Sequence, residues 1–183
     1  MKQLFTTVVA IFFMVTTSFA YDNFFYKNAS GQWNIFGHSG NHTLNPSCVM
    51  QTSWKDGSNL LVIQDLFDGE LYINFLNKKW NMQGPYNKKY ELTLRFIKGK
   101  NTIDFNAEFI LTNNDSIVIR DIKHKAFLDS FSTSDTMIFI VHGDTPDISV
   151  GLKGSSNILD SLKECMFESQ NVRLYNPKKG QAI

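Results

Sequence analysis

Apolar and polar residues alternate along much of this chain, in short runs separated by glycine, asparagine, aspartate and proline. In residues 90–97 every second side chain, starting at Tyr90, is apolar, and residues 102–111 repeat this pattern starting at Ile103. Successive side chains of a strand point to opposite faces of the sheet, so both runs predict half-buried antiparallel strands. The glycine-containing segment 98–101 between them predicts a hairpin turn.

Shorter runs of the same kind recur through the rest of the chain, each bounded by turn-forming residues. They are residues 32–36, 48–54, 60–64, 70–76, 116–120, 136–141 and 147–152. Many short strands at this spacing are typical of a β-sandwich or β-barrel, and they argue against alternating β-α units.

Two segments change to helical spacing. Residues 155–167 place their apolar side chains, with Cys165 among them, on one stripe of a C-terminal helix. Ser155 or Ser156 is the expected N-cap, because a serine hydroxyl can accept hydrogen bonds from the first N–H groups of a helix. A shorter helix is expected at 124–131. The sequence therefore predicts a mainly β fold, an antiparallel β-sandwich or barrel with a short helix and a C-terminal helix packed on it.

The N-terminus has the pattern of a secretory signal peptide. A positive charge precedes an apolar run of about 12 residues, and the small residues Ser18 and Ala20 suit signal peptidase. The run is shorter than the ~20 residues that span a bilayer, although an uncleaved membrane anchor is the alternative. We expect a signal peptide at 1–20, a single β-rich domain at 21–169 and a frayed tail at 170–183, in a periplasmic or secreted protein with no membrane span after cleavage.

The chain has two cysteines, Cys48 and Cys165. In an exported protein such a pair predicts one structural disulfide. The alternative is a pair of buried free thiols. A catalytic redox pair would have the much closer Cys-x-x-Cys spacing.

No pattern predicts a catalytic, cofactor-binding or metal site. His38 and His42 are four apart, but the glycine-containing segment between them predicts a loop, where that spacing has no meaning for metal binding. Ser39 and Ser155 lie near glycines without the adjacent base and acid that a nucleophile needs. The acids within 65–70 depart from the calcium-loop spacing and are typical of a hairpin turn. We therefore expect no cofactor.

The segment between residues 78 and 100 is rich in basic and aromatic residues and is the clearest candidate for a binding surface. The candidate binding patch consists of Lys78, Lys79, Trp80, Tyr86, Lys88 and Lys89. Aromatic faces with positive charges suit sugar rings, anionic polysaccharide or an acidic partner protein. The alternative is that the lysines are solvated at two turns while Trp80 belongs to the core.

The overall charge is balanced. The chain has 18 basic and 17 acidic residues, a net charge of +1, and loss of Lys2 with the signal peptide leaves 17 of each. This balance gives no reason to expect binding to nucleic acid or to an anionic membrane.

The order of several short motifs resembles an uncharacterised family of small exported bacterial β-rich domains. These motifs are Trp33 to Gly37, Cys48, Asn77 to Trp80, Tyr90 to Phe96, Phe127 with Phe131, Leu152 to Ser155, and Cys165. The resemblance covers most of the chain after the signal peptide and implies a β-sandwich-like domain with the two cysteines joined, but it supplies no catalytic residues. The N-terminal half is also loosely similar to the invasion-associated locus B-like periplasmic proteins.

These observations favour an exported, monomeric, non-enzymatic domain that binds a protein or polysaccharide partner in the envelope or outside the cell. Two alternatives remain open. An inhibitor of a secreted hydrolase would present an exposed loop, for which residues 37–47 are the candidate. An envelope-polymer hydrolase would need a cleft with acidic or histidine side chains in hydrogen-bond reach of one another.

Overall fold

The computed structural model describes residues 23–30, 32–40, 45–86, 88–120, 122, 124–143, 145–172, 175–176 and 181–182. The predicted signal peptide and parts of the predicted tail lie outside the described residues. The strands are β1 (Asn23–Ser30), β2 (Trp33–His38), β3 (Ser47–Ser53), β4 (Asn59–Asp65), β5 (Leu71–Leu76), β6 (Lys89–Lys98), β7 (Asn101–Asn113), β8 (Ser116–Ile119), β9 (Thr136–Val141), β10 (Ile148–Gly151), β11 (Tyr175–Asn176) and β12 (Gln181–Ala182). The helices are α1 (His124–Thr133), α2 (Ser155–Glu168) and the short 3-10 helix η1 (Ser169–Asn171).

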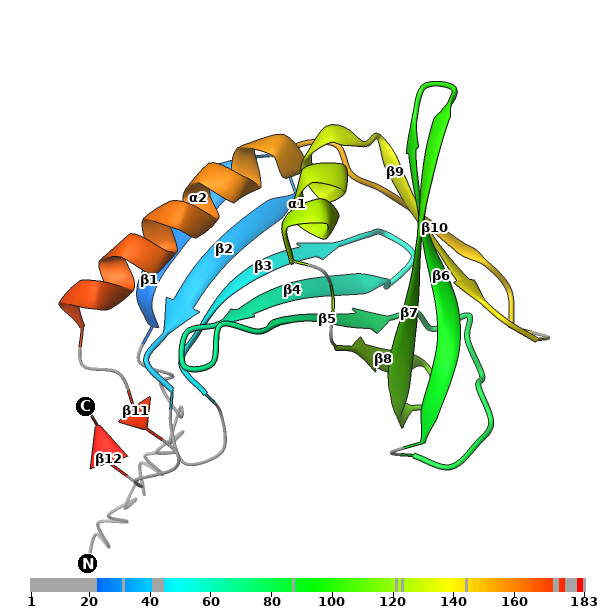
Figure 1. Cartoon of the computed structure of the whole chain (residues 1–183), viewed down its shortest axis with the longest axis horizontal. Coiled ribbons are helices and arrows are strands. Elements are labelled where there is room, and N and C mark those ends of the chain that lie inside the picture. The colour runs from blue at the N-terminus through cyan, green and yellow to red at the C-terminus, as the bar shows by residue number, and fades with distance from the viewer. Residues whose placement is uncertain are drawn as a thin grey trace, which may run out of the picture.

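Within the described residues, β1 to β10 form one antiparallel sheet in the order β1-β2-β3-β4-β5-β8-β7-β6-β9-β10 (Figure 1). The prediction of a mainly antiparallel β fold with a short helix and a C-terminal helix is confirmed. The sandwich or barrel is not confirmed, because these strands belong to a single sheet that does not close. Its two ends, β1 and β10, each pair with one neighbour in the described part of the chain.

The sheet bends so that its two halves face each other across the core. Phe75 of β5 stacks on Phe139 of β9, with the ring centroids 4.0 Å apart, although β8, β7 and β6 separate these strands in the sheet. Trp80 packs edge-on against Phe75 at 5.2 Å. Stacked and edge-to-face aromatic pairs add to the free energy gained by burying their apolar area.

Both helices pack against the core. α2 contacts β1, β2, β3 and α1, and it buries Ile158 and Leu162. Ser155 does not cap this helix as expected: its hydroxyl donates to the Phe131 carbonyl of α1 at 2.7 Å, which ties the two helices together. The residue before the helix is Gly154, whose φ of +91° is a left-handed conformation that glycine adopts without a steric cost.

The predicted disulfide between Cys48 and Cys165 is confirmed. It joins β3 to α2 across 117 positions of sequence, and both side chains are fully buried. Gly37 of β2 pairs with Cys48, and a Cβ atom at Gly37 would lie 2.5 Å from Phe24 and 2.8 Å from the Cys165 sulfur. The close approach of β1, β2, β3 and α2 at this point therefore requires glycine at position 37.

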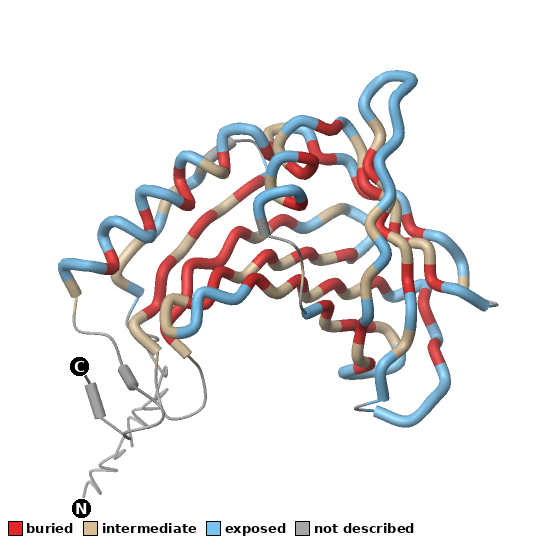
Figure 2. The backbone as a smooth tube through the Cα atoms, in the orientation of Figure 1, coloured by how far each residue is buried: buried red, intermediate tan, exposed pale blue. Residues whose placement is uncertain are grey.

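The hairpin predicted from residues 90–111 forms as β6 and β7, and Figure 2 shows its alternation of buried and half-buried positions near the core. The alternation that starts at Ile103 predicts an inward-facing side chain at this position, but Ile103 is 51% exposed. The reason is that the tip of this hairpin extends past the helices and has no core to pack against (Figure 1).

Candidate binding site on the outer face of the sheet

Strand β4 is apolar on both faces, whereas a sheet with one face in water normally alternates. Leu60 and Val62 point into the core and are fully buried. Leu61 and Ile63 point to the opposite face and are half-buried. We call this second face, which lies away from the core and α2, the outer face.

Cross-strand pairing arranges apolar side chains of the outer face in a row. Phe36 of β2 pairs with Val49 of β3, which pairs with Ile63 of β4. Ile63 in turn pairs with Tyr72 of β5. This row lies in a hollow of about 700 Å³, which we call the outer hollow. Its lining residues are Asn23, Phe36, His38, Asn45, Ser47, Val49, Leu61, Ile63, Asp65, Tyr72, Asn74, Val118 and Arg120.

His38 and Ser47 lie in the next row, at one side of the outer hollow. The His38 Nδ1 atom accepts a hydrogen bond from the Gly40 N–H at 3.2 Å, so the neutral ring has its proton on Nε2. Nε2 therefore donates to the Ser47 hydroxyl oxygen, 2.8 Å away. Burial lowers the pKa of His38 below its ordinary 6.5, and the nearby Asp65 carboxylate opposes this only in part. In this arrangement the imidazole does not act as a base toward Ser47.

Asp65 lies beside Ser47, and its carboxylate accepts hydrogen bonds from the turn that follows β4. One carboxylate oxygen accepts the N–H groups of Phe67 at 2.7 Å and Asp68 at 3.2 Å. The other accepts the Asn45 side-chain amide at 2.7 Å. Asp65 thus fixes the geometry of this side of the hollow.

The described part of the chain contains no group of three or more His, Cys, Asp or Glu side chains that could hold a metal ion.

Arg120 lies at the other end of the hollow. Its guanidinium carbon is 5.5 Å from the centre of the Tyr72 ring, a cation–π contact that orients the side chain. The Tyr72 hydroxyl donates to Glu70 at 2.7 Å, and burial together with this hydrogen bond raises the pKa of Tyr72. Among the ion pairs of the described residues, none involves Arg120.

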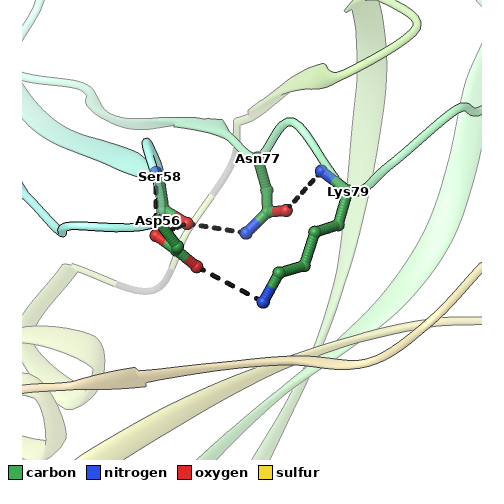
Figure 3. A network of polar contacts seen from close by, with 4 residues as sticks. All are labelled: Asp56, Ser58, Asn77 and Lys79. Atoms are coloured by element: carbon green, nitrogen blue, oxygen red, sulfur yellow. Dashed lines mark hydrogen bonds and ion pairs between the residues drawn. The ribbon is translucent and has the colours of Figure 1, made fainter.

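The residues of the basic, aromatic candidate patch lie in two separate places in the structure. Trp80 is 3% exposed and its indole N–H donates to the Pro146 carbonyl at 2.9 Å, so its ring belongs to the core. Lys78 extends along Gly57 of the β3–β4 turn. Lys79 is 3.6 Å from Asp56 of the same turn, within a network that includes Ser58 and Asn77 (Figure 3).

The other members of the patch lie near β6 and β7. Lys88 lies over the Tyr90 ring at 5.7 Å, and Lys89 forms an ion pair of 2.7 Å with Glu108. Tyr86 is 53% exposed and donates to Asn114 at 2.8 Å. These side chains are accessible, but the buried Trp80 does not join them in one aromatic platform.

The outer hollow is a feature of the structure that the sequence analysis above does not predict. The available signal was the run Leu60 to Ile63, which is apolar at four consecutive positions where a half-exposed strand would alternate. The loop expected at 37–47 borders the hollow through His38 and Asn45, while residues 41–44 lie outside the described residues. His42 lies in that segment, and the side chain of His124 is likewise not among those that the structure describes.

Comparison with protein-family models, with curated proteins and with solved structures found no match to this chain. Across the described residues, no helix has the length and apolar character needed to cross a membrane.

Proposed function

We propose that this chain is an exported, non-enzymatic binding protein and that the outer hollow is its ligand site. The observation that supports this most is the row of aliphatic and aromatic side chains on the outer face. Half-buried apolar side chains that line a hollow are typical of binding surfaces. A volume of about 700 Å³ suits a small molecule or one segment of a larger envelope component.

The polar groups around the hollow favour binding over hydrolysis. His38 donates to Ser47 and is kept neutral by burial, so it does not activate this hydroxyl as a nucleophile. The Asp65 oxygens accept three hydrogen bonds from the turn and from Asn45, so this carboxylate holds the turn in place.

Export is proposed from two features. Residues 1–20 have the signal-peptide pattern, and the Cys48–Cys165 bond is of the kind that persists in oxidising compartments such as the periplasm or the extracellular space.

The test is a titration with N-phenyl-1-naphthylamine, a neutral apolar dye whose fluorescence rises in apolar surroundings. We expect saturable binding that Ile63→Glu weakens at least tenfold, because a carboxylate in the apolar row must be desolvated when the dye binds. The matched control is Ile138→Glu. Ile138 is also half-buried on the outer face, but on β9 and outside the outer hollow.

Circular dichroism would establish that both variants are folded. The proposal is abandoned if the dye does not bind, or if the two variants weaken binding equally.

A further inference from the structure

We infer that the ligand of the outer hollow is an amphiphile with one anionic group, whose apolar part lies along the row from Phe36 to Ile63 and whose anion is bound by Arg120. This inference rests on the proposed function and adds the chemical class of the ligand. It follows from the direction of the apolar row, from the charges around the hollow and from the chemistry of the guanidinium group.

The apolar row runs across the strands toward Arg120. It crosses β2, β3, β4 and β5, and β8 is the next strand of the sheet. Neighbouring strands are about 4.8 Å apart, so the distance from β2 to β8 is roughly 19 Å. Arg120 directly follows β8 and contacts the Tyr72 ring at the end of the row. A ligand lying in the hollow would therefore have an elongated apolar body with one end at the guanidinium.

Among the described residues that line the hollow, the positive charge is that of Arg120, at this end. Asp65 lies on the β4 side and its two oxygens are held by the turn and by Asn45. His38 is neutral above the lowered pKa that its burial produces. Arg120 also lines a second hollow of about 490 Å³, which contains the carboxylates of Glu91 and Glu108. Glu108 is paired with Lys89 at 2.7 Å, and Glu91 lies opposite Glu108 in the β6–β7 register.

A guanidinium group recognises carboxylate, sulfonate and phosphate oxygens through paired hydrogen bonds. The Tyr72 ring restricts Arg120 at 5.5 Å, so less side-chain freedom is lost when an anion binds. Because Arg120 borders both hollows, a polar headgroup can extend toward the second one while the apolar body stays in the first.

The experiment compares two dyes that differ in one group. 1-Anilinonaphthalene-8-sulfonate is N-phenyl-1-naphthylamine with an added sulfonate. We expect the protein to bind the sulfonate dye more tightly than the neutral dye. Arg120→Gln should weaken the sulfonate dye about tenfold or more and leave the neutral dye within twofold, because only the anion loses its charged hydrogen bonds.

The matched control is Arg95→Gln. It removes an arginine from the same face of the sheet, but at a site that pairs with Asp104 at 2.8 Å and lies outside both hollows. Displacement of the sulfonate dye by decanoate and by decyl phosphate, each compared with decanol, then distinguishes a carboxylate ligand from a phosphate ligand.

The outcomes separate the two proposals. Three results would overturn the anionic ligand while the hollow remains a binding site. They are equal affinity for the two dyes, equal weakening of both dyes by Arg120→Gln, and displacement by the anions that is no better than displacement by decanol. Failure of the neutral dye to bind, or insensitivity to Ile63→Glu, would instead overturn the binding function itself.

Discussion

At the scale of single residues, the imidazole of His38 makes stability depend on pH. Burial lowers its pKa in the folded chain below the 6.5 that it has when solvated. The unfolded chain therefore binds a proton more readily than the folded chain between these two values. The free energy of unfolding is fully retained above about pH 6.5 and falls as the pH drops through the lowered pKa, by at most about 1.4 kcal/mol per pH unit for one proton.

Urea unfolding of the wild type and of His38→Gln between pH 7.5 and 5 measures this effect. We expect the loss of stability on acidification to be smaller in His38→Gln, because glutamine does not titrate. His142→Gln is the control, since His142 is exposed. Identical pH profiles for the wild type and His38→Gln would show that this imidazole does not contribute.

At the scale of elements, one polar network joins the β3–β4 turn to the segment after β5 (Figure 3). The buried Asn77 side chain donates to the Ser58 hydroxyl at 2.6 Å and accepts the Lys79 N–H at 2.8 Å. Asn77→Ala would remove both hydrogen bonds and leave the Lys79 N–H without this acceptor, at a cost of about 1–3 kcal/mol in the free energy of unfolding. The backbone N–H of Trp80 donates to the backbone carbonyl of Asn77 at 3.0 Å, so a shift of the Asn77 backbone after loss of its side chain should also loosen this tryptophan.

Chemical denaturation followed by tryptophan fluorescence tests the role of Asn77. Lys79→Gln is the comparison within the same network. Its ammonium group is exposed and 3.6 Å from Asp56, so its removal should cost less than about 1 kcal/mol. Equal effects of the two substitutions would contradict the distinction between the buried amide and the exposed ion pair.

Elements with clean periodicity could be predicted from sequence, and elements that depend on their neighbours could not. β6 and β7 follow from alternation and a short turn, which are local properties. β1 was not predicted, because its adjacent Phe24 and Phe25 break the alternation and its pairing with β2 has irregular register at both ends. Ser155 does not have the capping role expected of it, because its hydroxyl donates to the Phe131 carbonyl of another helix.

At the scale of the whole molecule, the open sheet could not be predicted because it depends on distant pairings. β5 pairs with β8 and β6 pairs with β9, so consecutive strands are not always neighbours. The candidate site has the same origin. Phe36 and Ile63 come from separate strands, and Arg120 is the residue after a third. They meet only through the register of the sheet, and no local pattern singles out Arg120.

The Cys48–Cys165 bond also acts on the whole molecule. It closes a loop of more than a hundred residues, so its removal by Cys48→Ser with Cys165→Ser should lower the free energy of unfolding by about 2–5 kcal/mol. Urea unfolding with and without reductant measures this. Reductant should destabilise the wild type and have no effect on the double variant. A wild type that is fully reduced, as shown by alkylation of both thiols, yet equally stable would contradict this expectation.

The same bond gives the chain the topology of a covalent ring with two tails. The ring contains every element from β4 to β10, while β1 and β2 belong to the N-terminal tail that folds back onto it. The exposed β6–β7 hairpin tip belongs to the ring and extends past the helices (Figure 1). A protease that cleaves this tip would open the ring without releasing a fragment, so the nicked chain would remain one molecule until the disulfide was reduced.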